Sequence, residues 1–278
     1  MKLLTALFGF AVAAAMPAQS VAGASTESFG GRNLIVYQPE NLPPAGHRAL
    51  VVVLHGGLGN AQRIASGGAE SALNLNAEAD KDGFLVVYLN GTPVTRRLGD
   101  NFLGWNAGGG CCGMSAENNI DDVGYIQGAV HELEAKYGVD PARVFGIGHS
   151  NGAMMTQRLM CVTDLYASAI AISGALDAPD TACPAARGKH ILALHGQDDE
   201  NVPIAGGRGT KGVAGIAFGS EAHSREVFTQ SGATYDLQIV PGAPHALAEI
   251  DAAIQKTEGR SIPQKAAAYF RLAAGSSD

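Results

Sequence analysis

The sequence contains few charged residues and no excess of positive charge. Charged side chains make up 16% of the 278 residues, against about 25% in a typical soluble domain. Lys and Arg number 19, Asp and Glu number 26, and the formal net charge is −7 at pH 7. A nucleic-acid surface needs stripes of Lys and Arg to neutralise phosphates. We therefore expect no nucleic-acid partner.

Repetitive patterns are absent as well. The sequence has no internal repeat, no low-complexity linker and no coiled-coil heptad. Its 37 glycines follow no G-x-y period, which excludes collagen and indicates tight turns and close backbone approaches. The length suits one large α/β domain with a sizeable core. We expect this single domain to comprise residues 25–278.

The first 24 residues have the pattern of a secretory signal peptide. Lys2 supplies the positive start, Leu3–Met16 form an uncharged apolar run, and Ala22–Ala24 offer a small-residue cleavage site. The apolar run is too short to cross a hydrocarbon core of about 30 Å. We therefore expect a cleaved signal peptide over residues 1–24, a secreted or periplasmic protein, and no stable membrane anchor.

Export affects how the four cysteines are interpreted. They are Cys111, Cys112, Cys161 and Cys183, and in an oxidising compartment they can pair in more than one way. Cys161 and Cys183 would close a modest loop, whereas the adjacent Cys111 and Cys112 are either bonded to each other or free. A zinc site is disfavoured because the spacings are wrong and no pair of histidines lies beside the cysteines.

Short apolar or β-branched runs alternate with helical patterns along the chain. The predicted strands are Asn33–Tyr37, Leu50–Leu54, Phe84–Leu89, Val144–Ile147, Ser168–Ile172, Ile191–Leu194 and Leu237–Val240. The predicted helices are Glu70–Lys81, Val123–Tyr137, Gly152–Asp164, Glu221–Ser231 and Pro263–Leu272. Several strands are apolar throughout, as expected of parallel strands covered on both faces. This alternation predicts a parallel sheet with helices on both faces.

Two long stretches fall outside this pattern. Gly91–Asn119 is rich in glycine and holds the only tryptophan, Trp105, while Ala205–Gly219 is rich in glycine and almost free of charge. Long loops in compact domains are usually functional or disordered. We expect these two to form walls or lids of a binding pocket.

The segment Gly148–Gly152 reads Gly-His-Ser-Asn-Gly and lies between a predicted strand and a predicted helix. A serine on such a sharp turn has a strained backbone, and the flanking glycines keep neighbouring atoms from clashing. The turn exposes the hydroxyl above the sheet, with a helix N-terminus beneath it that favours developing negative charge. We therefore predict that Ser150 is a nucleophile.

A serine nucleophile on this type of turn needs an orienting acid and then a base, in that order along the chain. Asp199 follows an apolar strand directly, at the carboxyl end where sites of α/β sheets collect. Asp177 is the alternative acid. Asp198 is expected to cap or turn the loop after this strand. His245 lies in the loop after the last predicted strand and is the predicted base, because His223 falls inside a helical pattern.

The segment His55–Gly59, with the sequence His-Gly-Gly-Leu-Gly, follows a predicted strand and offers backbone N–H groups with little side chain in the way. We predict an oxyanion hole made by the N–H groups of Gly57 and Asn151, with Leu58 as the second choice for the first donor. The resulting acyl-transfer mechanism needs neither a metal nor an organic cofactor, and we expect none.

In these features the chain resembles a family of secreted α/β-hydrolase esterases that includes polyhydroxybutyrate depolymerase-like and feruloyl esterase-like proteins. The shared motifs are His55–Gly57, Trp105–Gly113 (WNAGGGCCG), Asp121–Gly124, Gly148–Cys161 (GHSNGAMMTQRLMC) and His195–Pro203 (HGQDDENVP). The resemblance implies the α/β-hydrolase fold, with a mostly parallel central sheet and helices on both faces.

The resemblance also implies a serine carboxylic ester hydrolase acting on small-molecule or oligomeric esters of feruloyl, acetyl or 3-hydroxybutyrate type. A poly(3-hydroxybutyrate) depolymerase proper and a serine peptidase of the same fold are the alternatives. The resemblance also assigns the role of the acid to Asp199 and implies a disulfide between Cys161 and Cys183. We interpret Asp121 and Asp122 as a helix cap and a carboxylate that braces a loop.

Three residues are candidates for the substrate pocket: Trp105, Tyr125 and His149. We predict substrate contacts from Trp105 and His149. The chain departs from the family after the predicted base, where a Trp-containing turn is common, because here His245 is followed by Ala246–Glu249. We therefore expect one aromatic wall of the pocket to be missing.

Overall fold

The computed structural model describes residues 23–67, 70–178, 182–212 and 214–272. Most of the predicted signal peptide, residues 1–22, lies outside these ranges, and Gly23 and Ala24 begin the first strand. In the described ranges, no helix combines the length and the apolar character needed to span a membrane.

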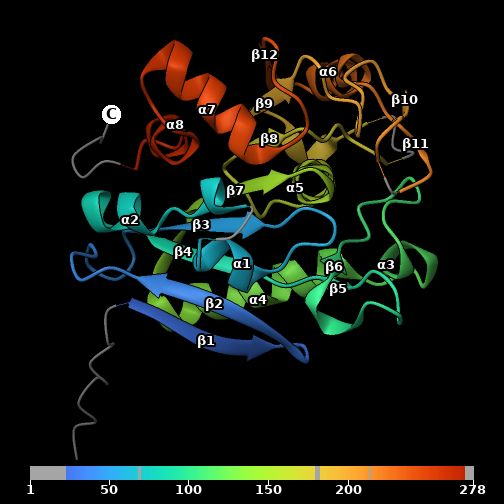
Figure 1. The fold of residues 1–278 in the computed structure, drawn as a ribbon. Coiled ribbons are helices and arrows are strands. Elements are labelled where there is room, and N and C mark those ends of the chain that lie inside the picture. The colour runs from blue at the N-terminus through green and yellow to red at the C-terminus, as the bar shows by residue number, and fades with distance from the viewer. Residues whose placement is uncertain (1–22, 68–69, 179–181, 213, 273–278) are drawn as a thin grey trace, which may run out of the picture.

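A central sheet of eight strands organises the described part of the chain (Figure 1). The strand order across the sheet is β1-β2-β4-β3-β7-β8-β9-β12. The strands are β1 Gly23–Phe29, β2 Arg32–Gln38, β3 Arg48–Leu54, β4 Leu85–Leu89, β7 Val139–His149, β8 Ser168–Ile172, β9 His190–Gly196 and β12 Thr234–Val240.

The sheet is parallel except at one edge, where β1 pairs antiparallel with β2, and β2 pairs antiparallel with β4. The strands from β4 to β12 run parallel. In this register Leu54 pairs with Gly148, and His149 pairs with Ile172. The carboxyl ends of β3, β7 and β8 therefore meet at one edge, where ligands bind in open α/β sheets.

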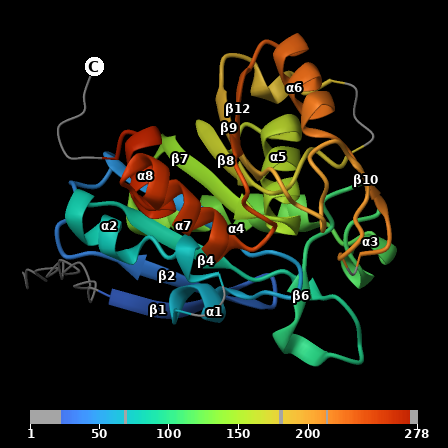
Figure 2. The ribbon, with the colours of Figure 1, turned by 45° about the horizontal axis from the view of Figure 1, so that its top comes forward.

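Helices cover both faces of the sheet (Figures 1 and 2). On one face lie α1 Ala61–Ala65, α2 Asn76–Asp82, α7 Leu247–Glu258 and α8 Ile262–Tyr269. On the other face lie α4 Asp122–Tyr137, α5 Asn151–Val162 and α6 Glu221–Gln230. The architecture is the α/β-hydrolase fold that the sequence predicts.

Apolar side chains fill the space between the sheet and each helical layer. Val51 and Val53 of β3 belong to the core on one face, while Val52 and Leu54 belong to the core on the other. All four are fully buried. Successive residues of a strand point to opposite faces, so a strand covered on both sides must be apolar at every position.

All seven predicted strands are present, but one helix prediction is wrong in its first half. Within the predicted helix Glu70–Lys81, residues Ser71–Leu73 form a short 3₁₀ turn, and α2 begins only at Asn76. The Asn74 side chain accepts a hydrogen bond from the Asn76 N–H. This side-chain bond replaces a helical backbone bond, so the chain starts a new helix there.

Among the elements of seven or more residues, the prediction omits β1 and α7. β1 is an edge strand of small and polar residues that are mostly exposed or half-buried, so it lacks the apolar alternation that marks a strand. α7 follows Ala246 without a capping side chain, and the usual signal for a helix start is therefore missing.

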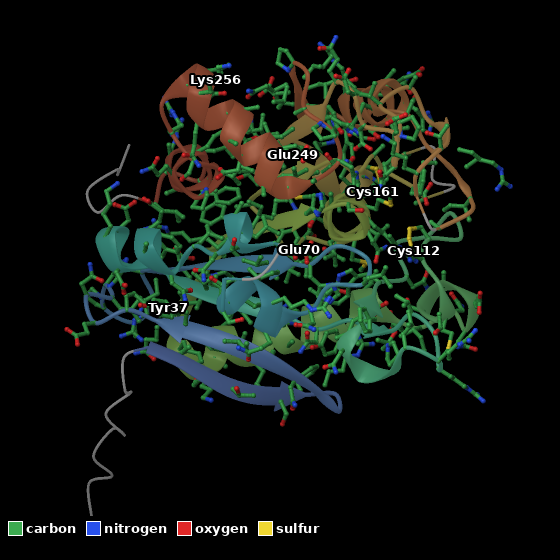
Figure 3. All side chains as sticks on the ribbon, viewed as in Figure 1. Tyr37, Glu70, Cys112, Cys161, Glu249 and Lys256 are labelled. Atoms are coloured by element: carbon green, nitrogen blue, oxygen red, sulfur yellow. A yellow bond between two sulfur atoms is a disulfide. The ribbon has the colours of Figure 1, made fainter. Side chains whose placement is uncertain are left out.

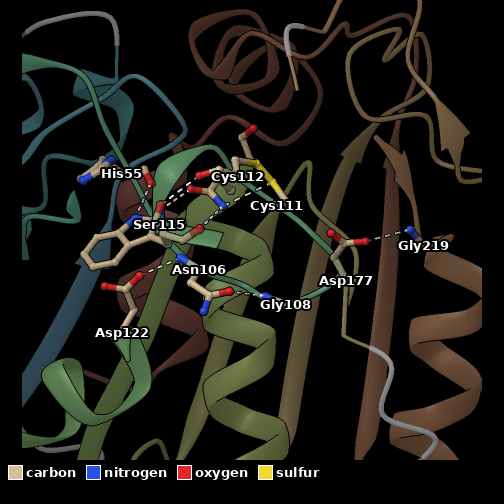
Figure 4. Close-up of a disulfide and its surroundings, with 12 residues drawn as sticks. His55, Asn106, Gly108, Cys111, Cys112, Ser115, Asp122, Asp177 and Gly219 are labelled. Carbon is tan, nitrogen blue, oxygen red and sulfur yellow. Dashed lines mark hydrogen bonds between the residues drawn. A yellow bond between two sulfur atoms is a disulfide. The ribbon is translucent and has the colours of Figure 1, made fainter. Parts of the chain in front are cut away.

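The acidic pair at the start of α4 has the two roles expected of it. Asp121 accepts a hydrogen bond from the Gly124 N–H at 2.8 Å and caps the helix. The buried Asp122 carboxylate binds the Arg32 guanidinium at 2.5 Å. It also accepts the Asn106 N–H at 2.7 Å (Figure 4). It thereby anchors the long loop between β4 and α4 to the edge of the sheet.

Candidate active site

Ser150 lies on the sharp turn between β7 and α5. Its backbone is strained, with φ of 54° and ψ of −121°. A side chain at Gly148 would overlap the carbonyl of Gly152, and one at Gly152 would overlap the carbonyl of Leu54. Only glycine fits at both positions, which explains the Gly-His-Ser-Asn-Gly sequence of the turn.

The structure brings Ser150, His245 and Asp199 into one hydrogen-bonded chain. The Ser150 hydroxyl lies 2.9 Å from Nε2 of His245, and Nδ1 of His245 lies 2.7 Å from Oδ2 of Asp199. The other oxygen of Asp199 accepts the N–H groups of Asn201 and Val202. The carboxylate is therefore fixed on both sides.

The other candidates lie elsewhere. The Asp177 carboxylate accepts a hydrogen bond from the Gly219 N–H at 3.4 Å and contacts no histidine among the described residues. Asp198 and His223 are exposed. His223 belongs to α6, as its helical pattern predicts. Among the alternatives considered, Asp199 and His245 alone have the geometry needed to orient and deprotonate Ser150.

The electrostatic surroundings of the triad favour a neutral His245 beside a charged Asp199. Burial would raise the pKa of Asp199, but hydrogen bonds from His195 and His245 outweigh it and hold that pKa well below its usual value. Burial lowers the pKa of His245, and Asp199 offsets part of that decrease. At neutral pH His245 is therefore uncharged and free to accept the serine proton.

Two of the residues around the cavity above Ser150 are the predicted oxyanion-hole donors. Gly57 and Asn151 both line the cavity, and Asn151 is the first residue of α5, where backbone N–H groups have no helical partner. The N–H of Leu58, by contrast, donates to the carbonyl of Leu103 at 2.8 Å. Leu58 is therefore unsuited to the oxyanion hole, and Gly57 fits that position better.

Glu70 (labelled in Figure 3) lines the same cavity, although no sequence motif marks it as a site residue. Its Oε1 accepts the N–H of Gly56 at 2.7 Å and lies 3.2 Å from Nδ1 of His149. The other ring nitrogen of His149 donates to the carbonyl of His245 at 3.0 Å. Glu70 thus links the glycine-rich segment, the serine turn and the loop that carries His245.

Replacing Glu70 with Ala is expected to weaken this linkage. The Gly56 N–H would lose its acceptor, and an unpaired buried donor costs about 1–3 kcal/mol of unfolding free energy. Glu70→Gln keeps an oxygen for Gly56 and should destabilise less. Thermal unfolding of both variants, together with kcat/KM, measures the effect. Equal stability of Glu70→Ala and wild type would contradict it.

Trp105 is not a pocket residue, contrary to the prediction. Its side chain is fully buried, it does not line the cavity, and its indole N–H donates to the carbonyl of His55 at 3.0 Å. Its backbone N–H and carbonyl pair with the side chain of Asn151. Trp105 therefore connects the residue after Ser150 to the glycine-rich segment that begins at His55. Tyr125 is also buried and packs under Arg32.

A largely apolar cavity of about 880 Å³ opens over Ser150. Both long loops contribute to its walls, as expected, and His149 also lines it. The aliphatic and aromatic side chains that line it are Leu58, Val94, Leu98, Met154, Val202, Ala214, Ile216, Phe218, Ala246 and Leu247. Pockets of this size and character hold small organic ligands.

The four cysteines form two close pairs, of which one lies at the cavity. The sulfur atoms of Cys161 and Cys183 are within bonding distance and connect the end of α5 to the segment before Pro184. Those of Cys111 and Cys112 are also in contact, and both residues line the cavity (Figure 4).

Comparisons with known proteins agree with this fold and place the chain among esterases. The chain is 30% identical over 145 residues to the acetylxylan esterase of Coprinopsis cinerea (50% of this chain, 35% of the relative). It is 29% identical over 180 residues to feruloyl esterase B of Piromyces equi (63% of this chain, 31% of the relative). It spans less than half the length of the curated relatives it matches.

A solved structure titled LpqC, poly(3-hydroxybutyrate) depolymerase, from Bordetella parapertussis has a TM-score of 0.55 and 18% identity. The match covers 91% of this chain and 96% of that one. At this identity the likeness shows the fold alone. A phospholipase/carboxylesterase profile matches residues 41–247. The chain therefore belongs to the phospholipase/carboxylesterase family of α/β-hydrolases.

Proposed function

We propose that the chain is a serine carboxylesterase. The observation that carries the proposal is the hydrogen-bonded chain Ser150–His245–Asp199 at the base of an apolar cavity. An acyl-transfer enzyme needs a nucleophile, a base in contact with it and an acid that orients the base. Family membership independently favours ester hydrolysis.

In the proposed mechanism His245 takes the proton of Ser150 as the hydroxyl attacks an ester carbonyl. The N–H groups of Gly57 and Asn151 stabilise the oxyanion that forms. Protonated His245 then donates its proton to the leaving alcohol, which leaves an acyl group on Ser150. Water releases this group by the same steps in reverse, and Asp199 keeps the His245 ring oriented throughout.

We propose acetyl-type or feruloyl-type esters, or short 3-hydroxybutyrate oligomers, as the substrate class. Relatives named as acetylxylan and feruloyl esterases support the first two, and the named depolymerase structure supports the third. Ala246 and Leu247 line the cavity next to His245, where the family often has a tryptophan. This small apolar wall favours aliphatic over aromatic acyl groups.

Kinetics on a matched panel test the proposal. Acetylated xylan, methyl ferulate and 3-hydroxybutyrate oligomers should be compared with p-nitrophenyl acetate at equal enzyme concentration. We expect hydrolysis of p-nitrophenyl acetate, with higher kcat/KM for the aliphatic esters of the panel than for methyl ferulate. Absence of hydrolysis of every ester, by a folded protein, would reject the esterase function.

We further propose that residues 1–24 are a cleaved signal peptide and that residues 25–278 are the single catalytic domain.

We also propose that Cys161 and Cys183 form a disulfide in the exported protein. A disulfide that closes a loop with a sequence separation of 22 stabilises a fold by about 3 kcal/mol. We expect both cysteines to resist thiol labelling until a reductant is added, and the free energy of unfolding to fall after reduction. Labelling followed by peptide mass spectrometry checks this, and modification of either residue without reductant would contradict it.

A further inference from the structure

A histidine other than His245 also contacts the Asp199 carboxylate. His195 is fully buried near the end of β9, and its Nε2 lies 3.3 Å from Oδ2 of Asp199. That oxygen is the one that His245 also contacts. Asp199 is therefore shared by two histidines, of which only His245 reaches Ser150.

The partners of His195 determine its protonation. Nε2 lies 2.9 Å from the carbonyl of Val202, which can only accept, so Nε2 must carry a proton. Nδ1 lies 2.7 Å from Oε1 of Glu221, and Oε2 of Glu221 accepts the hydroxyl of Tyr235 at 2.5 Å. A carboxylate with this second donor favours a proton on Nδ1 as well, which makes His195 an imidazolium.

The charges around His195 agree with this assignment. His195 faces two carboxylates: Asp199 in the loop after β9 and Glu221 on α6. Two further titratable groups lie near these carboxylates: Tyr235 on β12 beside Glu221, and His245 in the loop before α7 beside Asp199. Burial alone would lower the pKa of His195, but the hydrogen bonds to Asp199 and Glu221 raise it to about 9. The two carboxylates are thus bridged by one buried cation.

We propose that His195, held as an imidazolium by Glu221, is a positioning residue that fixes Asp199 and limits how strongly this carboxylate attracts a proton to His245. This inference rests on the proposed function, because it treats His245 as the base of an esterase. The cation shares the negative charge of Asp199 and is repelled by a protonated His245. His245 therefore loses its proton at a lower pH than it would beside an unshared aspartate.

Two measurements test the proposal, and the first needs no activity. In ¹⁵N-histidine NMR of the wild-type protein, we expect both ring nitrogens of His195 to stay protonated up to pH 8. In Glu221→Gln the carboxylate is lost, so His195 should release its proton at least one pH unit lower. A wild-type His195 that is neutral at pH 7 would overturn the proposal, whatever the enzyme hydrolyses.

The second measurement is the pH dependence of kcat/KM. Replacing His195 with Gln removes the cation, so His245 should hold its proton more tightly, and the acidic limb should move up by roughly 0.5 to 1 pH unit. Tyr235→Phe is the matched control, since it removes a hydrogen bond to Glu221 but leaves both charges. We expect a lower Tm and an unmoved acidic limb in that variant.

The outcomes distinguish this inference from the proposed function. An unchanged or lowered acidic limb in an active His195→Gln protein would reject the role of His195 while leaving the esterase function intact. A wild-type protein that hydrolyses no ester would reject the function, and the NMR result would still decide the protonation of His195. An equal shift in Tyr235→Phe would mean that looser packing, not charge, moves the limb, and would also overturn the proposal.

Discussion

Replacing Ser150 with Ala is expected to lower kcat/KM for p-nitrophenyl acetate by roughly 10⁴- to 10⁶-fold. The substitution removes the only side-chain oxygen in contact with Nε2 of His245 among the described residues. Without it no acyl-enzyme can form, and the oxyanion donors can assist only a direct attack by water. Initial rates and labelling by a fluorophosphonate probe both report the loss.

Ser173 provides the matched control for this experiment. It is a buried serine at the end of the neighbouring strand β8, with a positive φ of 52°, and its hydroxyl has no hydrogen-bond partner among the described residues. Ser173→Ala makes the same chemical change without touching His245 and should keep wild-type kcat/KM. Similar activity in both variants would contradict a nucleophilic role for Ser150.

The sequence predicts the fold and the serine turn well because their signals are local. Buried parallel strands must be apolar at every position, so the runs in β3 and β4 mark the sheet without any knowledge of its neighbours. The turn at Ser150 requires glycine on both sides for steric reasons that act within a few residues. The positions of Asp199 and His245 then follow from the order of elements in this type of fold.

The residues that surround Ser150, His245 and Asp199 could not be predicted in the same way, since their roles depend on contacts between distant segments. Glu70 meets His149 across 79 positions, and His195 meets Glu221 across 26. No periodicity or spacing in the sequence marks such pairs. For Trp105 the local signal was misleading. Its position in a glycine-rich loop predicts a pocket residue, whereas in the structure its indole N–H donates to the carbonyl of His55.

Replacing Asp199 with Asn is expected to lower kcat/KM by a factor on the order of 10⁴ at neutral pH. The amide has nearly the same shape, so the hydrogen bonds from the N–H groups of Asn201 and Val202 can persist. It no longer stabilises a proton on Nδ1 of His245. Nε2 then carries the proton and faces Ser150 as a donor, which prevents it from acting as a base.

Asp177→Asn is the control that separates this effect from the general loss of a buried carboxylate. Burial raises the pKa of Asp177 from 3.8 to about 6, so the fold loses stability as the pH rises between these values, and the full loss is present at pH 8. Asp177→Asn should therefore keep full activity and should be no less stable than the wild type at pH 8. Rates and thermal unfolding of both variants at pH 8 decide the matter. Full activity of Asp199→Asn, or an equal loss in Asp177→Asn, would show that Asp199 does not orient His245.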